Sequence, residues 1–247
     1  MSQMYGPDVS FLGCERRALD DLTEDVDVVI VGAPYDSGTS YRSGARFGPM
    51  AIRSTDYLGH DAWRPSLALG VDPFADLTIV DIGDVLMAPD MREVAFANLE
   101  ETVHRVVSEA GAFPVVLGGD HSIALPDVTA VARHVGFGRV GVVHFDAHAD
   151  TGDTTFGSLY GHGEPMRRLI ESGAARGDRF LQLGLRGYWP GPETLAWMAE
   201  QGMRWYEMTE VVDRGLDACL DEAFEIATDD CDAVWLSIDI DVVDPGS

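Results

Sequence analysis

Short apolar runs rich in Val and Ile alternate with longer stretches of helical spacing along this chain, and this alternation constrains the fold. We predict buried strands at 27–34, 77–85, 113–120, 139–150, 179–187 and 233–244, with a shorter strand near 203–208. We expect helices at 91–111, 122–136, 163–177, 192–202 and 211–230. Because strands that alternate with helices form βαβ units, the pattern predicts a three-layer α/β/α fold with a mostly parallel sheet. With no linker or repeat in the pattern, residues 1–247 are interpreted as a single domain.

The charge of the chain argues against two classes of partner. Its formal net charge is −25, and all 17 basic residues are arginine. A surface this acidic repels nucleic acid and anionic membranes, so neither is expected as a partner. No apolar run approaches the roughly 18 residues of a membrane span, and the N-terminal residues lack the order of a signal peptide. We therefore expect a cytoplasmic protein whose cysteines are reduced thiols.

The motif "HFDAHAD" (144–150) places an ionisable side chain at every second position after an apolar run. These residues are His144, Asp146, His148 and Asp150. If the strand continues through the motif, all four side chains point to the same side, because successive side chains of a strand alternate faces. Such a row at a strand end predicts a ligand site.

Two further motifs place similar side chains after strands. "SIDIDVVDP" (237–245) carries Asp239 and Asp241 on one face, and "GGDHS" (118–122) carries His121 just past a strand end. Ligands of parallel sheets bind at the carboxyl ends of the strands. We therefore expect the three motifs to meet in one site, the alternative being that they are solvated acidic strand ends.

Carboxylates that share a desolvated site need a cation to compensate their charge. Carboxylate and imidazole ligands without thiolates suit Mn²⁺, Zn²⁺ or Fe²⁺. There are more candidates than one tetrahedral ion needs, so two ions are predicted, held by His121, Asp146, His148, Asp150, Asp239 and Asp241. His144 is expected to support a ligand rather than to be one. Asp120 and Asp244 are expected to support ligands or to form turns.

The three motifs resemble the signature motifs of the ureohydrolases, the arginase and agmatinase family of binuclear manganese enzymes. The segment "GAPYDSGTSYRSGARFGPMAIR" (32–53) is similar to the N-terminal part of agmatinases, and the resemblance extends from about Asp27 to the end of the chain. It implies an arginase-like fold and two Mn²⁺ ions per subunit. One ion would be held by His121, Asp146, Asp150 and Asp239, and the other by Asp146, His148, Asp239 and Asp241.

The reaction that the resemblance implies is hydrolysis of a guanidinium group to urea and an amine, by attack of a hydroxide that bridges the two ions. Asp150 would orient this hydroxide and pass its proton to the departing amine. His162, in "YGHGEP", matches the family's loop histidine, which is suited to proton transfer near neutral pH. Ureohydrolases are usually trimers or hexamers, so a homo-oligomer is expected.

The segment "GLRGYWP" (184–190) bears on the substrate. Arginases carry a similar segment with two aspartates, and here Gly187 and Trp189 stand at those positions. This favours a substrate without an α-amino acid head, above all agmatine, whose amine product is putrescine. Guanidinobutyrate and guanidinopropionate are the alternatives, and their carboxylate would require a cationic partner. Asp153 is a candidate for attracting a cationic tail, although an exposed loop aspartate is the simpler interpretation.

The family continues past the motif at 237–245 for several dozen residues, whereas this chain ends at Ser247. We therefore expect the last strand and helix of the family, and a glutamate that grips the guanidinium, to be missing. The domain is interpreted as incomplete at its C-terminus. A second hypothesis follows, namely a truncated, non-catalytic paralogue that binds metal.

Overall fold

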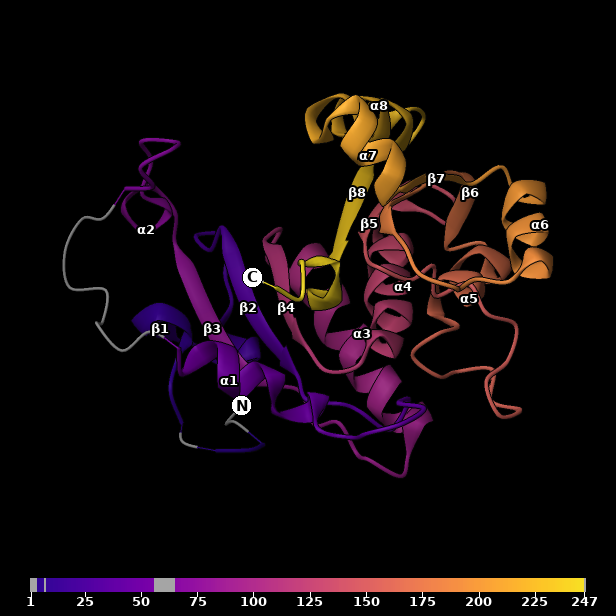
Figure 1. Cartoon of the computed structure of the whole chain (residues 1–247). Helices are drawn as coiled ribbons and strands as arrows, with labels where there is room; N and C mark the ends of the chain where they lie inside the picture. The colour runs from indigo at the N-terminus through magenta and orange to yellow at the C-terminus, as the bar shows by residue number, and fades with distance from the viewer. Residues whose placement is uncertain (1–3, 7, 56–64, 247) are drawn as a thin grey trace. The chain divides into compact units, whose positions relative to one another are not determined.

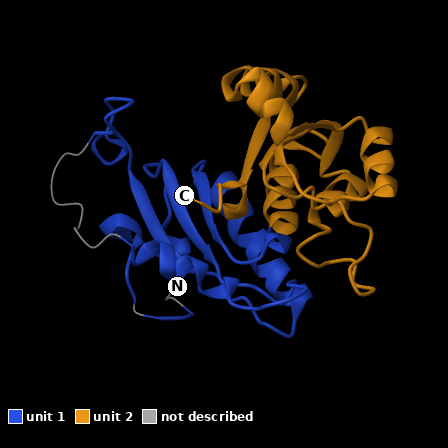
Figure 2. Cartoon of the chain, in the orientation of Figure 1, with its two compact units in different colours: residues 1–123 blue, residues 124–247 orange. Residues whose placement is uncertain are grey.

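The computed structural model describes residues 4–6, 8–55 and 65–246. The chain forms two compact units, Met1–Ile123 and Ala124–Ser247, which Figure 2 shows in separate colours. Each unit contains a four-stranded sheet whose strand pairs are all parallel. The prediction of a parallel-sheet α/β fold is confirmed, with the described strands in two hydrogen-bonded sheets. Among the described residues, no helix has the length and apolarity that crossing a membrane requires.

The first unit has a sheet in the order β1-β3-β2-β4. Its strands are β1 (Glu15–Arg16), β2 (Val28–Ala33), β3 (Ile79–Asp84) and β4 (Phe113–Gly118). Its helices are α1 (Gly48–Arg53), α2 (Pro73–Asp76) and α3 (Arg92–Ser108), as Figure 1 shows. The β-branched run of β2 is almost wholly buried, as expected for a strand with a neighbour on each side.

The second unit has a sheet in the order β7-β6-β5-β8. Its strands are β5 (Val140–Phe145), β6 (Ala175–Leu185), β7 (Arg204–Glu207) and β8 (Ala233–Ile238). Its helices are α4 (Ala124–Val135), α5 (Pro165–Ser172), α6 (Pro192–Glu200), α7 (Met208–Arg214) and α8 (Leu216–Thr228). β5 lies between β6 and β8, so the residues that follow β5 and β8 start from adjacent strand ends.

The two faces of this second sheet differ in chemistry. One face carries Val143, Leu183 and Tyr206, which pack with buried residues of α7 and α8. Side chains alternate along a strand, so His144 and Gln182 point to the opposite face. There the buried His144 ring lies edge-on to the ring of Phe180. This opposite face supports the candidate site.

Two predicted helices differ from the structure because of glycines. The helix expected at 211–230 is divided into α7 and α8 at Gly215, whose φ of 88° lies in the left-handed region. The helix expected at 163–177 ends at Ser172, where Gly173 adopts φ 77° as its C-terminal cap. The chain enters β6 at Ala175.

Candidate metal centre

Asp146 and Asp239 begin the loops that leave two adjacent strands. β5 ends at Phe145 and β8 at Ile238, and these two residues are directly paired. The backbone N–H of Asp239 donates to the carbonyl of Phe145 over 2.9 Å. The two carboxylates therefore start from the same level of the sheet, at the carboxyl end where ligands of parallel sheets bind.

The alternation argument was wrong for both motifs, because neither strand continues through its aspartates. After Phe145 the chain turns, and the N–H of His148 donates to the Asp146 carboxylate over 2.7 Å. After Ile238 a short 3-10 helix forms, capped by the Asp239 carboxylate, which accepts from the N–H of Asp241 at 3.0 Å. Turns formed by the aspartates themselves, rather than a strand pleat, set these side chains.

Asp146, His148 and Asp241 lie together in this geometry. Their nearest ligand atoms are all within 4.8 Å of one another. His148 Nδ1 is 3.0 Å from one oxygen of Asp241 and 3.5 Å from one oxygen of Asp146. Asp146 is buried, whereas His148 and Asp241 are half exposed. Two carboxylates and an imidazole that converge in this way have the composition of a site for a divalent cation.

The electrostatics of the cluster support the same interpretation. Burial, followed by the charges of Asp239 and Asp146, raises the pKa of Asp241 to about 6. A carboxylate is therefore disfavoured here by the carboxylates around it, and a cation among these oxygens would relieve the repulsion. The donor set thus fits a metal ion and matches the hard ligands that Mn²⁺ accepts.

The buried His144 side chain forms a hydrogen bond with the carboxylate of Asp146. Its Nε2 is 2.9 Å from an Asp146 oxygen, and its Nδ1 is 3.0 Å from Nε2 of Gln182. The same Gln182 nitrogen donates to the carbonyl of Ala149 at 2.5 Å, which identifies that end of the side chain as the amide NH₂. Nδ1 of His144 is therefore an acceptor, and Nε2 carries the proton donated to Asp146. This arrangement fits the expectation that His144 supports a ligand.

We expect His144→Phe to weaken Mn²⁺ binding by roughly 10–100-fold, because an unsupported ligand loses its orientation. Phenylalanine preserves an aromatic ring in the buried position and removes the hydrogen bond. Calorimetric titration with Mn²⁺ measures the effect. His134→Phe, at the exposed end of α4, is the matched control. Equal affinity in the two variants would show that His144 has no part in the site.

Gln182 and Arg186 contribute to the site and were not singled out from the sequence. The Arg186 guanidinium donates to the carbonyls of Asp241 and Val243, at 2.5 and 3.2 Å, and its backbone N–H donates to Ala147 at 3.0 Å. Arg186 thereby ties the loop after β6 to both metal-site loops. A glutamine inside an otherwise apolar buried strand was the one available signal, since buried polar groups need partners.

Gly184 allows the close approach of β6 to Asp146. Its φ is 111°, and a Cβ there would lie 2.7 Å from Val242 Cγ2 and 2.9 Å from the carbonyl oxygen of Asp146. Neither the backbone conformation nor the space would accept a side chain. The glycine therefore lets the loops after β5 and β8 close against β6.

His121 belongs to the first unit, where it begins a short 3-10 helix (His121–Ile123) after β4. The neighbouring Asp120 is buried, and its carboxylate accepts from the N–H groups of Gly38 at 2.7 Å and Ser122 at 2.9 Å. Asp120 thus fixes the loop after β2 beside His121, in agreement with its expected supporting role. That His121 is a metal ligand stays a prediction.

Asp150 and His162 lie at the two ends of the loop that follows the first motif. Asp150 has φ 50°, and its carbonyl accepts from the N–H of Met166 at 3.1 Å. The loop ends are joined by a hydrogen bond from Gly152 to Gly163, 2.8 Å long. His162 is partly buried beside this junction. The catalytic roles of Asp150 and His162, and the ligand role of Asp150, stay predictions.

Asp153 does not present an isolated charge in this loop. It lies 3.4 Å from Arg168 and 3.7 Å from Arg167. These ion pairs favour the simpler interpretation of Asp153 as a loop residue. The N–H of Gly246 donates to Asp244 over 2.7 Å, which agrees with the turn-forming role expected there.

Comparison with known proteins defines the class to which this fold and cluster belong. The model of the arginase family matches residues 26–247, so the chain belongs to the arginase family. It is 38% identical over 221 residues to a guanidinobutyrase of Pseudomonas aeruginosa, covering 89% of this chain and 66% of that protein. It is 37% identical over 232 residues to a mitochondrial agmatinase of Gallus gallus, covering 93% of this chain and 65% of that protein. The chain thus spans about two thirds of these relatives.

Solved structures agree with this assignment. Proclavaminate amidino hydrolase from Streptomyces clavuligerus superimposes with a TM-score of 0.84 at 33% identity, over 98% of this chain and 77% of that chain. A Trypanosoma cruzi formiminoglutamase with Mn²⁺ superimposes with a TM-score of 0.73 at 31% identity, over 86% of this chain and 72% of that chain. The solved structures thus support the same family and the same parallel α/β fold.

Proposed function

We propose that this protein hydrolyses a linear guanidino compound to urea and an amine, with agmatine as the substrate and putrescine as the amine. The observation that carries the proposal is the convergence of Asp146, His148 and Asp241 at the carboxyl end of the second sheet. Family membership supports the reaction class. Relatives named guanidinobutyrase, agmatinase and guanidinopropionase share 36–38% identity with the chain. Because two of these relatives are named for guanidinobutyrate and guanidinopropionate, those two compounds remain the alternative substrates.

Two Mn²⁺ ions are proposed as the cofactor, because the donor set is hard and a structural relative is described with Mn²⁺. Bound divalent cations would supply the activation of water that hydrolysis at neutral pH requires. The proposed ligands are His121, Asp146, His148, Asp150, Asp239 and Asp241. A homo-oligomer, trimeric or hexameric, and a cytoplasmic location remain predictions.

Side chains of this protein would carry out the proton transfers and fix the orientation of Asp146. Asp150 would orient the attacking water and carry its proton to the departing nitrogen, as general acid–base catalysis requires. His162 would exchange that proton with solvent, because histidine titrates near neutral pH. His144 and Gln182 would keep Asp146 in one orientation throughout.

We expect the Mn²⁺-loaded protein to release urea from agmatine at least about 100-fold faster than from arginine. Gly187 and Trp189 offer no charged side chain to the amino acid head of arginine, and the α-carboxylate that distinguishes this head from the tail of agmatine would be repelled by the acidic protein. A colorimetric urea assay on agmatine, arginine and 4-guanidinobutyrate in parallel measures the preference. Equal rates with arginine would refute the specificity argument. No urea from any compound, with two Mn²⁺ bound per chain, would favour the non-catalytic alternative.

A further inference from the structure

Two adjoining pockets in the second unit lie along β7 and at the carboxyl end of β6. One has a volume of about 440 Å³ and the other about 350 Å³. Both are lined by Trp205, Glu207 and Thr209, so they share a wall. We propose that Glu207, together with the aromatic side chains of Tyr188, Trp189 and Trp205, binds an alkylammonium group. This inference rests on the proposed function and assigns the residues that would recognise the substrate tail.

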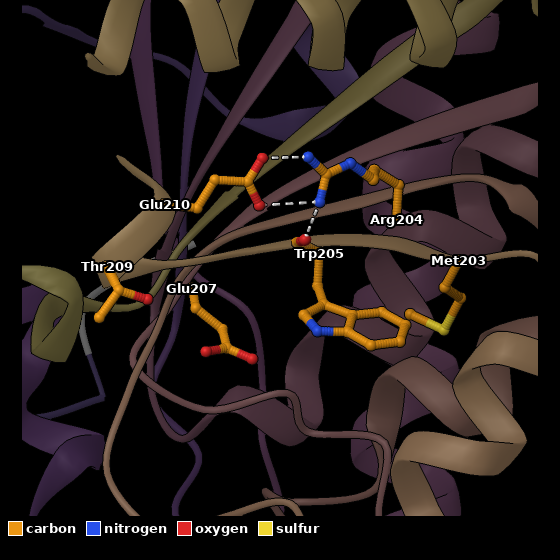
Figure 3. A pocket seen from close by; sticks show the side chains of 6 residues that line it. All are labelled: Met203, Arg204, Trp205, Glu207, Thr209 and Glu210. Carbon is orange, nitrogen blue, oxygen red and sulfur yellow. Dashed lines mark hydrogen bonds and ion pairs between the residues drawn. The ribbon is translucent and has the colours of Figure 1, made fainter. Parts of the chain in front are cut away.

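Strand geometry places this wall on the same face of the sheet as His144. Trp205 is paired with Gln182, which is paired with His144 across the neighbouring strand. Arg204 and Tyr206 point to the other face, because side chains alternate. Figure 3 shows Trp205 and Glu207 on one side of the strand, away from the Arg204–Glu210 pair. The residues shared by the two pockets therefore lie on the same face of the second sheet as His144 and Gln182, which support Asp146.

Glu207 differs from the other ionised residues of the two pockets in lacking a partner among the described residues. Arg204 pairs with Glu210 and with Glu222, and its guanidinium lies 3.8 Å from the centre of the Tyr206 ring. The Arg186 guanidinium is occupied by backbone carbonyls. The Glu207 carboxylate, by contrast, makes no hydrogen bond or ion pair with the described residues. It is thus available to a cation.

The aromatic residues complete the chemistry of a cation site. Tyr188 and Trp189 are 99% and 75% exposed, which is unusual for side chains this large, and both line the pocket with Trp205. The faces of aromatic rings attract ammonium groups, and an adjacent carboxylate adds a charged hydrogen bond. An anionic tail would instead be repelled by Glu207. The site therefore favours an amine over a carboxylate.

The separation between this wall and the acidic cluster matches a chain of a few methylenes. Asp146 follows β5 and Glu207 ends β7, with β6 between them, which corresponds to about 10 Å for two strand spacings. A guanidinium carbon and an ammonium joined through four methylenes are roughly 7 Å apart, and the glutamate side chain spans the remainder. Arg186 lines the pocket and contacts both metal-site loops, which connects the two regions.

The test is a fluorescence titration of the whole chain with butylammonium and, separately, with butyrate. We expect butylammonium to change the tryptophan emission and butyrate to have no effect, at an ionic strength that screens the acidic surface. Glu207→Gln should weaken butylammonium binding roughly 10-fold, because a charge-assisted hydrogen bond is lost. Glu225→Gln, an exposed position on α8, removes the same charge elsewhere and should leave binding unchanged.

Kinetics supply a second readout that distinguishes this inference from the proposed function. In Glu207→Gln we expect KM for agmatine to rise roughly 10-fold with kcat nearly unchanged, and KM for 4-guanidinobutyrate not to rise. Urea release with equal KM in the Glu207 and Glu225 variants, or equal binding of butyrate and butylammonium, would overturn the site. Butylammonium binding that depends on Glu207, without urea release from any compound, would uphold the site and refute the hydrolase.

Discussion

Asp146→Asn is expected to reduce both metal content and urea release strongly. Asp146 is buried, is held by His144, and lies against His148, so its charge is the centre of the cluster. Substitution of a residue that hydrogen-bonds to a metal ligand typically lowers metal affinity or activity by about 10–100-fold. Loss of the charge of a ligand itself should therefore lower urea release by at least about 100-fold. Asparagine retains the size of the side chain, removes its charge and replaces one acceptor oxygen with an NH₂ group.

Metal analysis and melting curves together identify the cause of this loss. We expect fewer Mn²⁺ ions per chain in Asp146→Asn and little or no increase in its melting temperature on addition of Mn²⁺. Without metal, the variant should melt somewhat below the natural protein, because its NH₂ group would face the N–H donor of His144 or of His148, although the repulsion of Asp241 is relieved. Asp221→Asn, exposed on α8, should behave like the natural protein. A variant that keeps two Mn²⁺ and full activity would exclude Asp146 as a ligand.

The sequence predicted that acidic and histidine side chains would gather after β5 and β8, and it misjudged how the three that do so are positioned. Spacing by two residues suggested a strand pleat, yet both strands end before their aspartates. The Asp146 and Asp239 carboxylates accept backbone N–H groups two residues further on, and these local turns compete with strand continuation. A spacing of two residues also suits turns of this kind, so the convergence of Asp146, His148 and Asp241 was expected from a geometry that the structure does not show.

The roles of Gln182 and Arg186 in supporting the site could not be predicted from the sequence. Gln182 and Arg186 act through partners distant in the chain, at Ala149 and Asp241, and pairings of this kind depend on strand register. Register follows from packing of whole elements and is not encoded in a short motif. The division at Gly215, by contrast, had a local signal, because a glycine inside a helical pattern often marks an end.

Arg53→Met is expected to destabilise the first unit strongly. Arg53 is the last residue of α1 and its side chain is fully buried. Its guanidinium contacts Asp81 through two nitrogens, at 2.8 and 2.9 Å, and Asp84 through a third, at 2.6 Å. Removing one partner of a buried ion pair leaves uncompensated charge, which costs about 3–5 kcal/mol in the free energy of unfolding.

The other contacts of Asp81 and Asp84 explain why these two carboxylates would stay buried and uncompensated in Arg53→Met. Asp81 also accepts from the N–H of Phe11 and from Arg16, and Asp84 accepts from the N–H of Met4. Both carboxylates therefore anchor the N-terminal segment to β3 and cannot turn to solvent without releasing it. Urea unfolding measures the change, with Arg139→Met as the control, since its pairs with Asp230 and Asp232 are exposed. Exposed pairs contribute about 0–1 kcal/mol, so similar losses in the two variants would show that the Arg53 pairs are no stronger than surface ones.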